Sequence, residues 1–277
     1  MTVTPGRFGV FARNTDLSPE LVATIEGLGY GAVWVGGSPP ADLEQVESFL
    51  AATDHIVVAT GIVNMWASPA AEVAASYARI AQRYPGRFLL GVGIGHPEAT
   101  GHYEKPYATI VEYLDDLDTG GVPVDGRALA ALGPKVLAVS RDRTAGAHPY
   151  LTTPRHTREA REILGEGPLL APEQKVVLDT DVERARAVDR EKVSNPYLKL
   201  TNYRNNLLRT GFTEQDLDTA SDALVDALAV HGDPATVAAG LTAHLDAGAD
   251  HVCAQVLVRD RADYVPALTT LAGALGL

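Results

Sequence analysis

Short apolar runs alternate along the chain with longer stretches in which apolar residues recur at helical spacing. The clearest run, Ile56 to Val63, is almost continuously apolar or β-branched, as is typical of strands buried on both faces of a parallel sheet. Similar runs predict strands at residues 8–12, 32–35 and 88–93. Gly, Pro or Asp separates each run from the next helical stretch. This order predicts parallel strands joined by crossover helices.

The helices expected between these strands have recognisable ends. Asp16 or Ser18 can cap a helix that stops at Gly29, and Pro69 stands in the first turn of a helix that runs to Tyr84. Apolar residues at helical spacing predict further helices at residues 43–52, 107–117, 156–164 and 264–275.

The second half is less regular, and its predicted strands cover residues 128–132, 145–148, 174–178 and 251–258. A long polar helical segment from Val182 to about Val230 precedes the capping signal Asp233-Pro234, so we interpret it as an insertion after the seventh strand. Eight strands fit a single (β/α)8 barrel domain over residues 1–277. A doubly wound open sheet stays the alternative.

Composition removes several classes of partner. The 277 residues carry a formal net charge of −12 without a cluster of Lys and Arg, which argues against nucleic acid. Cys253 is the only cysteine, so no disulfide framework or cysteine metal site is expected. The chain has no run of about 18 apolar residues and no apolar N-terminal signal, so we expect a cytoplasmic protein without a membrane partner.

The residues to inspect for chemistry are those just past the strand ends, because barrel active sites lie on the loops that follow the strands. These loops offer small residues, an amide, two imidazoles and aromatic faces. The segments are Gly36-Gly37-Ser38-Pro39, Asn64-Met65-Trp66, Gly95-His96 and His148-Pro149-Tyr150.

One long run carries a family resemblance. The segment from Val57 to Glu98, VVATGIVNMWASPAAEVAASYARIAQRYPGRFLLGVGIGHPE, resembles the central signature of the luciferase-like superfamily. Weaker similarity in AVWVGGSPP, ALGPKVLAVSRDRTAGAHPY, LLAPEQKVVLDTD and GDPATVAAGLTAHLDAGADHVCAQVL points to its subgroup of coenzyme F420-dependent oxidoreductases. The resemblance implies hydride transfer between a deazaflavin and a small organic substrate. It also implies a homodimer formed through helices of the first half, where Ala70 to Ala81 is rich in alanine.

The resemblance also implies where the cofactor lies. The ring is expected over the third strand, beside a cis peptide bond between Gly61 and Ile62, and the phosphate tail near the start of the helix after Gly133. The residues expected to contact the cofactor are Gly61, Ile62, Asn64, Gly93, Gly95, Gly133, Pro134, Lys135 and His148. A helix start has free N–H groups that suit an anion, and Lys135 adds charge, although Gly-Pro can simply begin a helix.

His96 is the candidate catalytic residue, because an imidazole at the barrel mouth can donate to a carbonyl or stabilise negative charge on a reduced ring. The alternative for His96 is an exposed loop histidine without a function. The alternatives for His148 and Asn64 are a strand-capping and a turn-capping role, respectively. The aromatic residues that could line a substrate pocket, or simply pack, are Trp34, Trp66, Tyr103, Tyr150, Tyr197 and Tyr203.

The chain departs from the sugar-phosphate dehydrogenases of this family, which resemble it at Trp34. Those enzymes have an Asp-His pair where this chain has Gly37-Ser38, and a glutamate where it has His96. The acid/base groups for a sugar alcohol are therefore missing. Gly91, Gly93 and Gly95 suggest a dinucleotide motif only weakly, because His96 replaces its last glycine.

Three other functions stay open. One is an FMN-dependent monooxygenase of the same fold, since nothing local separates a flavin pocket from a deazaflavin pocket. Another is a non-catalytic cofactor-binding protein, which the missing Asp-His pair favours. The third is a metal-dependent hydrolase whose ligands come from one loop, namely His96, Glu98, His102 and Glu104. These four residues are closely spaced in a predicted coil, so we predict no metal site.

Overall fold

The computed structural model describes residues 3–96 and 105–277. Its strands form one parallel sheet in the order β10-β9-β11-β1-β2-β3-β5-β6-β7-β8, and β4 also pairs with β5. The strands are β1 (Phe8–Arg13), β2 (Ala32–Gly36), β3 (Val57–Gly61), β4 (Val63–Asn64), β5 (Phe88–Gly93), β6 (Arg127–Leu129), β7 (Gly146–Ala147), β8 (Leu169–Leu170), β9 (Glu173–Val177), β10 (Ala229–His231) and β11 (Val252–Val256).

Residues 169–177 close the sheet into a ring. The start of this segment, β8, pairs with β7, and its end, β9, pairs with β11, which in turn pairs with β1. Counted with β3 and β4 as one strand and β8 and β9 as another, the ring has the eight strands of a (β/α)8 barrel. β10 is an additional strand that pairs with β9. The predicted fold class is therefore confirmed, and the open doubly wound sheet is wrong because such a sheet has two free edges.

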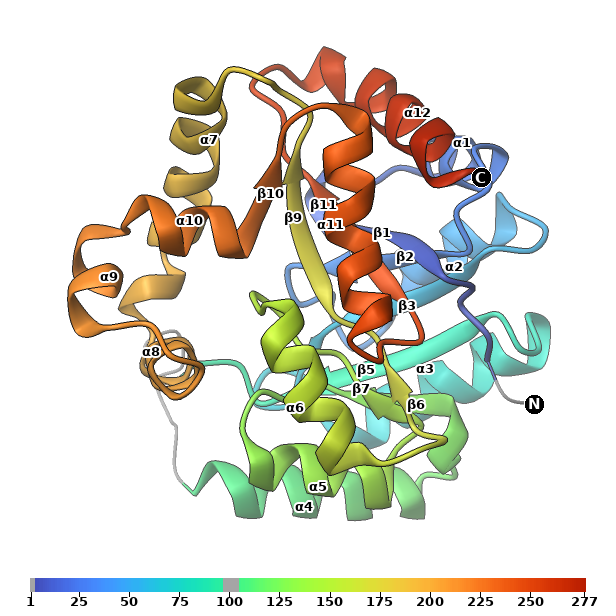
Figure 1. The fold of residues 1–277 in the computed structure, drawn as a ribbon. Coiled ribbons are helices and arrows are strands. Elements are labelled where there is room, and N and C mark those ends of the chain that lie inside the picture. The colour runs from blue at the N-terminus through green and yellow to red at the C-terminus, as the bar shows by residue number, and fades with distance from the viewer. Residues whose placement is uncertain (1–2, 97–104) are drawn as a thin grey trace.

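Helices cover the outside of this ring (Figure 1). They are α1 (Pro19–Gly27), α2 (Glu44–Ala51), α3 (Ala70–Arg83), α4 (Pro106–Thr119), α5 (Pro134–Arg143), α6 (Pro154–Leu164), α11 (Pro234–Asp246) and α12 (Tyr264–Leu275). Ser18 caps α1 by accepting a hydrogen bond from the Leu21 N–H, whereas Asp16 ends a short 3-10 turn instead. Asp233 caps α11 through the Thr236 N–H, as predicted. Among the described residues, no helix combines the length and the apolar character needed to cross a membrane.

The predicted insertion after the seventh strand is confirmed. It contains α7 (Val182–Ser194), α8 (Thr201–Arg209), α9 (Glu214–Thr219) and α10 (Asp222–Leu228), which form a separate group on one side of the barrel in Figure 1. The insertion ends earlier than predicted, because the chain returns at Ala229 to form β10 against β9. The sequence did not predict β8 or β10.

Alternating strand residues build two apolar layers. Outward-facing residues such as Val10, Val33 and Val176 pack under the helices. Inward-facing residues such as Trp34 and Cys253 fill the barrel. The insertion has its own apolar cluster, and Tyr150 packs against both that cluster and the barrel interior. Tyr150 therefore marks the junction at which the insertion meets the barrel mouth.

Candidate functional site

Glycines occupy the last inward positions of three neighbouring strands at the barrel mouth. The inward positions at the ends of β2, β3 and β5 are Gly36, Gly61 and Gly93. A Cβ at Gly61 would lie 2.9 Å from Cε2 of Phe11, and a Cβ at Gly93 would lie 2.9 Å from the Ala130 Cβ. Close packing alone therefore requires these glycines, because Phe11 packs against Gly36 and Gly61, and Ile62 packs against Gly93. Of the three glycines, Gly61 is partly exposed. The peptide bond between Gly61 and Ile62 is cis, as predicted.

His148 lies below Gly61 and is a hydrogen-bond acceptor. Its Nδ1 is 2.7 Å from the Ala171 carbonyl oxygen, which can only accept, so Nδ1 carries the proton. Burial lowers the pKa of His148 to about 4, so the ring is neutral and Nε2 has a free lone pair. Nε2 lies 3.1 Å from the Cβ position of Gly61 and has no hydrogen-bond partner among the described residues. Next to the Gly61 backbone there is thus a buried acceptor that no donor among the described residues occupies.

Trp34 lies deeper in the barrel than the predicted pocket. Its indole ring stacks on His148 with centroids 4.0 Å apart, and its Nε1 donates to Nε2 of His251 over 3.0 Å. The indole is fully buried. Trp34 therefore supports the site from below, and the structure does not bring it to the strand ends with the other predicted pocket residues.

Three tyrosines and a histidine gather at the mouth. Tyr197 and Tyr203, from the insertion, contact each other edge to face, with ring centroids 5.2 Å apart. The ring centroids of Tyr203 and His96 are 5.3 Å apart. The Tyr197 hydroxyl donates to that of Tyr150 over 2.9 Å, and Tyr150 donates to Oε1 of Gln255 over 2.8 Å. The structure thus brings together the predicted residues Tyr150, Tyr203 and His96.

A buried ion pair on β9 completes the opposite side, and the sequence prediction missed it. Nζ of Lys175 lies 3.1 Å from Oε1 of Glu173, and both side chains are at most 1% exposed. Oε2 of Glu173 also accepts from the Leu151 N–H over 3.1 Å. Burial raises the pKa of Glu173 and lowers the pKa of Lys175, while their attraction opposes both shifts.

Asn64 has the turn-capping role that was one of its two alternatives. Its Oδ1 accepts from the Trp66 N–H over 2.9 Å, and a Cβ at Gly95 would lie 2.6 Å from its Nδ2. Gly95 has a φ of +66°, where glycine is favoured. Asn64, Trp66 and Gly95 are all partly exposed at the mouth, so this turn forms part of its rim.

The start of α5 is open, as an anion site requires. Gly133 is the N-cap without a side-chain cap, a Cβ there would meet nothing within 4 Å, and Pro134 and Lys135 are exposed. Arg209 of α8, which the sequence prediction missed, reaches the carbonyl of Leu132 over 3.3 Å and forms an ion pair with Glu159 over 2.7 Å. Nδ2 of Asn206, whose Oδ1 accepts from Arg209 over 2.6 Å, is buried without a partner among the described residues.

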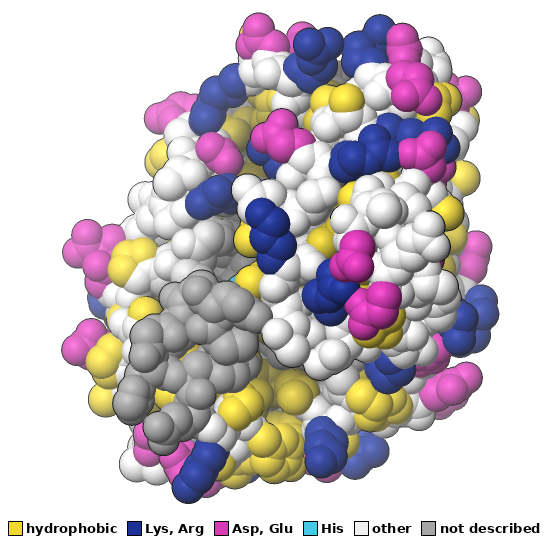
Figure 2. All heavy atoms as spheres, turned by 90° about the vertical axis from the view of Figure 1, so that its left-hand side faces the viewer, with side chains coloured by type: hydrophobic (Ala, Val, Ile, Leu, Met, Phe, Trp, Pro, Cys, Tyr) yellow, Lys and Arg dark blue, Asp and Glu magenta, His cyan; other side chains and the backbone are white. Residues whose placement is uncertain are grey.

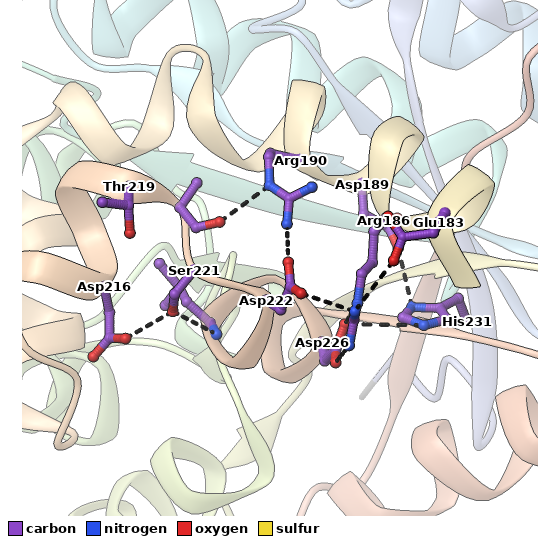
Figure 3. Close-up of polar contacts among 12 residues, drawn as sticks. Glu183, Arg186, Asp189, Arg190, Asp216, Thr219, Ser221, Asp222, Asp226 and His231 are labelled. Carbon is purple, nitrogen blue, oxygen red and sulfur yellow. Dashed lines mark hydrogen bonds and ion pairs between the residues drawn. The ribbon is translucent and has the colours of Figure 1, made fainter.

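Ion pairs fasten α7 to α10 beside the mouth (Figure 3). Arg186 contacts Asp226 over 2.6 Å and Asp222 over 2.9 Å, and Arg190 also pairs with Asp222. Asp189 is different: it is fully buried, its carboxylate accepts no hydrogen bond within the described residues, and Nδ1 of His231 is 3.5 Å away. Burial raises the pKa of Asp189 to about 7.

The remaining surface offers fewer possibilities. Figure 2 shows acidic and basic side chains intermixed on the face that it draws, without a field of one sign. A hollow of about 410 Å³ near the starts of α11 and α12 is lined by Asp179, Asp233 and Asp263, which disfavour a phosphate. No group of three or more metal-ligating residues occurs in the described part of the chain. The other loop residues of the hydrolase hypothesis, Glu98, His102 and Glu104, lie outside the described residues, as does Tyr103.

Residues 13–119 match the family model for luciferase-like monooxygenases. Among solved structures, an F420-dependent secondary alcohol dehydrogenase with an F420-acetone adduct is 15% identical, with a TM-score of 0.76 over 98% of this chain and 99% of that chain. The F420-dependent tetrahydromethanopterin reductase of Methanopyrus kandleri is 16% identical, with a TM-score of 0.68 over 98% of this chain and 99% of that chain.

An FMN complex has the same fold. The oxygenating constituent of 3,6-diketocamphane monooxygenase from Pseudomonas putida is 13% identical, with a TM-score of 0.71 over 98% of this chain and 97% of that chain. No curated protein matches the sequence. These comparisons confirm the resemblance to the luciferase-like superfamily, and identities this low establish only the fold.

Proposed function

We propose that this luciferase-like oxidoreductase binds coenzyme F420 at the barrel mouth and transfers a hydride between the deazaflavin and a small organic substrate. The observation that carries the proposal is the partnerless Nε2 of His148 beneath the partly exposed backbone of Gly61 and Ile62. A buried acceptor without a donor costs free energy, and a polar ring edge with N–H or O–H groups would supply the donor.

Other partnerless atoms also fit a cofactor with polar groups. The Thr152 hydroxyl, in the loop after β7, and the Asn206 amide, beside the start of α5, are buried without partners among the described residues. The Asn206 amide offers a donor and Lys135 a positive charge next to the free N–H groups of α5, where Arg209 holds Asn206 in place. This end of the mouth would hold the phosphate tail.

The residues of this chain would divide the work. When bound, the deazaflavin supplies a hydride donor or acceptor. The partly exposed backbone at Gly61 and Ile62 would let a flat ring approach, and His148 would orient it by accepting a hydrogen bond. Tyr150 and Tyr203 would exclude water from the substrate, and His96 would donate to a substrate or cofactor oxygen.

Turnover by the purified protein tests this function. We expect the absorbance of F420 to bleach with alcohols, or to return from reduced F420 with ketones or enones, in the presence of a metal chelator. Bleaching that requires the protein but not added FMN would support the proposal. A protein that leaves F420 unchanged with the whole panel, and does not bind it, would contradict it.

An FMN-dependent monooxygenase is the second candidate, because the family model that matches residues 13–119 is that of luciferase-like monooxygenases. That function predicts oxygen consumption with reduced FMN and an aldehyde or ketone. Oxygen uptake that follows product formation one to one would favour it over the deazaflavin function.

We also propose a cytoplasmic homodimer as the working form. The exposed face of α3 carries Ala71, Ala75 and Ala78 on one stripe beside Glu72 and Arg79, and small residues let helices pack closely. Light scattering should give twice the chain mass at micromolar concentration, and the A75R substitution should reduce it to the monomer mass. A monomer mass for the unaltered protein would contradict this assembly.

A further inference from the structure

We propose that Lys175 is the proton donor and acceptor for the substrate oxygen and that Glu173 is its positioning residue. This inference rests on the proposed hydride-transfer function and gives that function the acid/base group missing at Gly37-Ser38. Neither residue was among the site residues predicted from the sequence.

Both side chains point into the barrel at its mouth. Ala171 belongs to the interior cluster, and residues two and four positions further along the strand share its face. The register pairs Glu173 with Cys253, also an interior residue, and Lys175 with Gln255. Gln255 accepts the hydrogen bond of the Tyr150 hydroxyl, so Lys175 lies beside the tyrosine cluster.

The ammonium group of Lys175 has donor capacity left over. Its Nζ is 3.1 Å and 3.3 Å from the two carboxylate oxygens of Glu173, and it makes no other hydrogen bond within residues 3–96 and 105–277. The Tyr150 ring centroid lies 3.9 Å from Nζ and the Tyr197 centroid 5.2 Å. An ammonium has three N–H groups, and the two contacts with Glu173 leave at least one for another acceptor.

A purely structural role accounts poorly for this pair. Buried ion pairs contribute little to stability compared with well-packed apolar residues of the same volume, because both charges lose their hydration. The position could hold apolar residues like those at Ala171 and Val177 on the same strand face. A lysine kept at the barrel mouth against that cost is typical of acid/base sites.

The groups that face Lys175 allow it to exchange a proton. Glu173 and Asp189 stabilise the charged form, whereas burial among the tyrosine rings disfavours it and dominates, so the pKa of Lys175 is lowered. Cys253 faces it from β11. A lowered pKa makes the amine a better proton carrier near neutral pH. Asp189 lies on the buried face of α7, next to His231 (Figure 3). Its carboxyl group is the second acidic group that acts on Lys175.

The step balances in both directions. In alcohol oxidation the carbinol carbon gives its hydrogen with both bonding electrons to the oxidised deazaflavin, which is the oxidant, and the hydroxyl proton passes to the neutral amine of Lys175. In carbonyl reduction the reduced deazaflavin is the hydride source, and the Lys175 ammonium gives one proton to the carbonyl oxygen. Glu173 fixes Nζ in both cases and takes no part in the electron transfer.

The other imidazoles are less suited to this step. His148 is neutral, uses its only proton on Ala171, and can only accept at Nε2. His251 lies below Trp34 and is bonded on both ring nitrogens. His96 stays the alternative donor, and it is separated from Lys175 by the tyrosine rings, so the two hypotheses can be told apart by substitution.

The first test needs no cofactor. Nitrogen NMR of lysine-labelled protein should show one Nζ, absent from K175M, that titrates at least one pH unit below the exposed lysines. A Lys175 signal that stays charged to the same pH as the exposed lysines would overturn the proposal. This titration can be measured even if F420 does not bind. Failure to bind F420 would contradict the proposed function but not the proton exchange at Lys175.

The second test separates chemistry from structure. The double variant E173L/K175M removes both charges together, so it should keep its urea midpoint and bind F420 within about threefold of the unaltered protein. Its single-turnover hydride-transfer rate, with the most active ketone or enone, should fall at least 100-fold. Methylamine should restore part of the rate in K175A but not in H96A. A double variant that retains the rate within threefold would overturn the proposal.

Discussion

The two sides of the barrel mouth are built from opposite kinds of residue. On the β2, β3 and β5 side the inward positions are Gly36, Gly61 and Gly93, which carry no side chain and have Phe11 and Ile62 packed against them. On the β7, β9 and β11 side the corresponding positions carry ionisable or hydrogen-bonding side chains, namely His148, Tyr150, Glu173, Lys175 and Gln255. One side has the shape that a flat ring needs, and the other has the groups that move protons.

This difference indicates how the barrel divides its work. A surface without side chains can approach a cofactor ring closely, but it offers no titratable group. Titratable groups in a dry interior have shifted pKa values, which suits acid/base chemistry and costs stability. The mouth therefore keeps the costly groups on one side, where the insertion covers them.

The largest expected effect comes from breaking the buried ion pair on one side only. In E173Q the charge of Lys175 loses its counter-ion inside the barrel, so we expect a loss of about 3–5 kcal/mol in the free energy of unfolding. Urea denaturation measures it. The double variant E173L/K175M is the control and should keep its urea midpoint. Equal losses in the two variants would show that packing, and not the charge, explains the effect.

Asp189 should make stability depend on pH. Burial raises its pKa from 3.8 to about 7, so the folded state favours the protonated carboxyl, and stability is full below about pH 4 and falls as the pH rises through about 7. D189N should remove this dependence and be more stable at pH 8, by about 2–4 kcal/mol. The exposed Asp246 provides the control D246N. Urea midpoints at pH 5 and pH 8 that shift equally in D189N and the unaltered protein would refute the assignment.

A side chain at Gly61, on the glycine side of the mouth, should block the cofactor. In G61A the new methyl group would meet Phe11 at 2.9 Å and Nε2 of His148 at 3.1 Å, so the ring of one of them must move. We expect F420 affinity to fall at least tenfold, or about 1.4 kcal/mol. The matched control is G27A in α1, where a Cβ meets nothing within 4 Å. Unchanged affinity in G61A would place the ring elsewhere.

The smallest effect lies outside both sides, at the start of α5. K135Q removes one exposed charge next to the free N–H groups, so we expect F420 affinity to fall about three- to tenfold at low salt and less at 0.5 M salt. K192Q, on the exposed part of α7, should leave affinity unchanged. Equal effects of the two substitutions would mean that the phosphate tail does not lie at α5.

The sequence predicts the first half of the fold well because each strand there is a long buried run with clear caps. Ile56 to Val63 and Ser18 are examples, and the structure differs from these predictions by one or two residues. The strands Leu169–Leu170 and Ala229–His231 are too short to show a period, so only the closed ring reveals them.

The residues of the candidate site were also predicted unequally well from the sequence. His96, Tyr150 and Tyr203 follow strand ends or carry aromatic rings, and they were predicted for that reason. Glu173 and Lys175 were missed because two charges in a short strand suggest an exposed face, and their burial depends on α7 and the insertion covering them. A signal was present: charges at alternate positions of a strand in a parallel sheet, which is normally buried on both faces.

The central claim is that the barrel mouth holds a deazaflavin, and its most direct test is a fluorescence titration of F420 with the purified protein, with FMN as competitor. We predict saturable binding of F420 at one site per chain, at least tenfold tighter than FMN, and weakened by G61A and K135Q but not by G27A. FMN binding tenfold tighter than F420, a difference of about 1.4 kcal/mol, would contradict it.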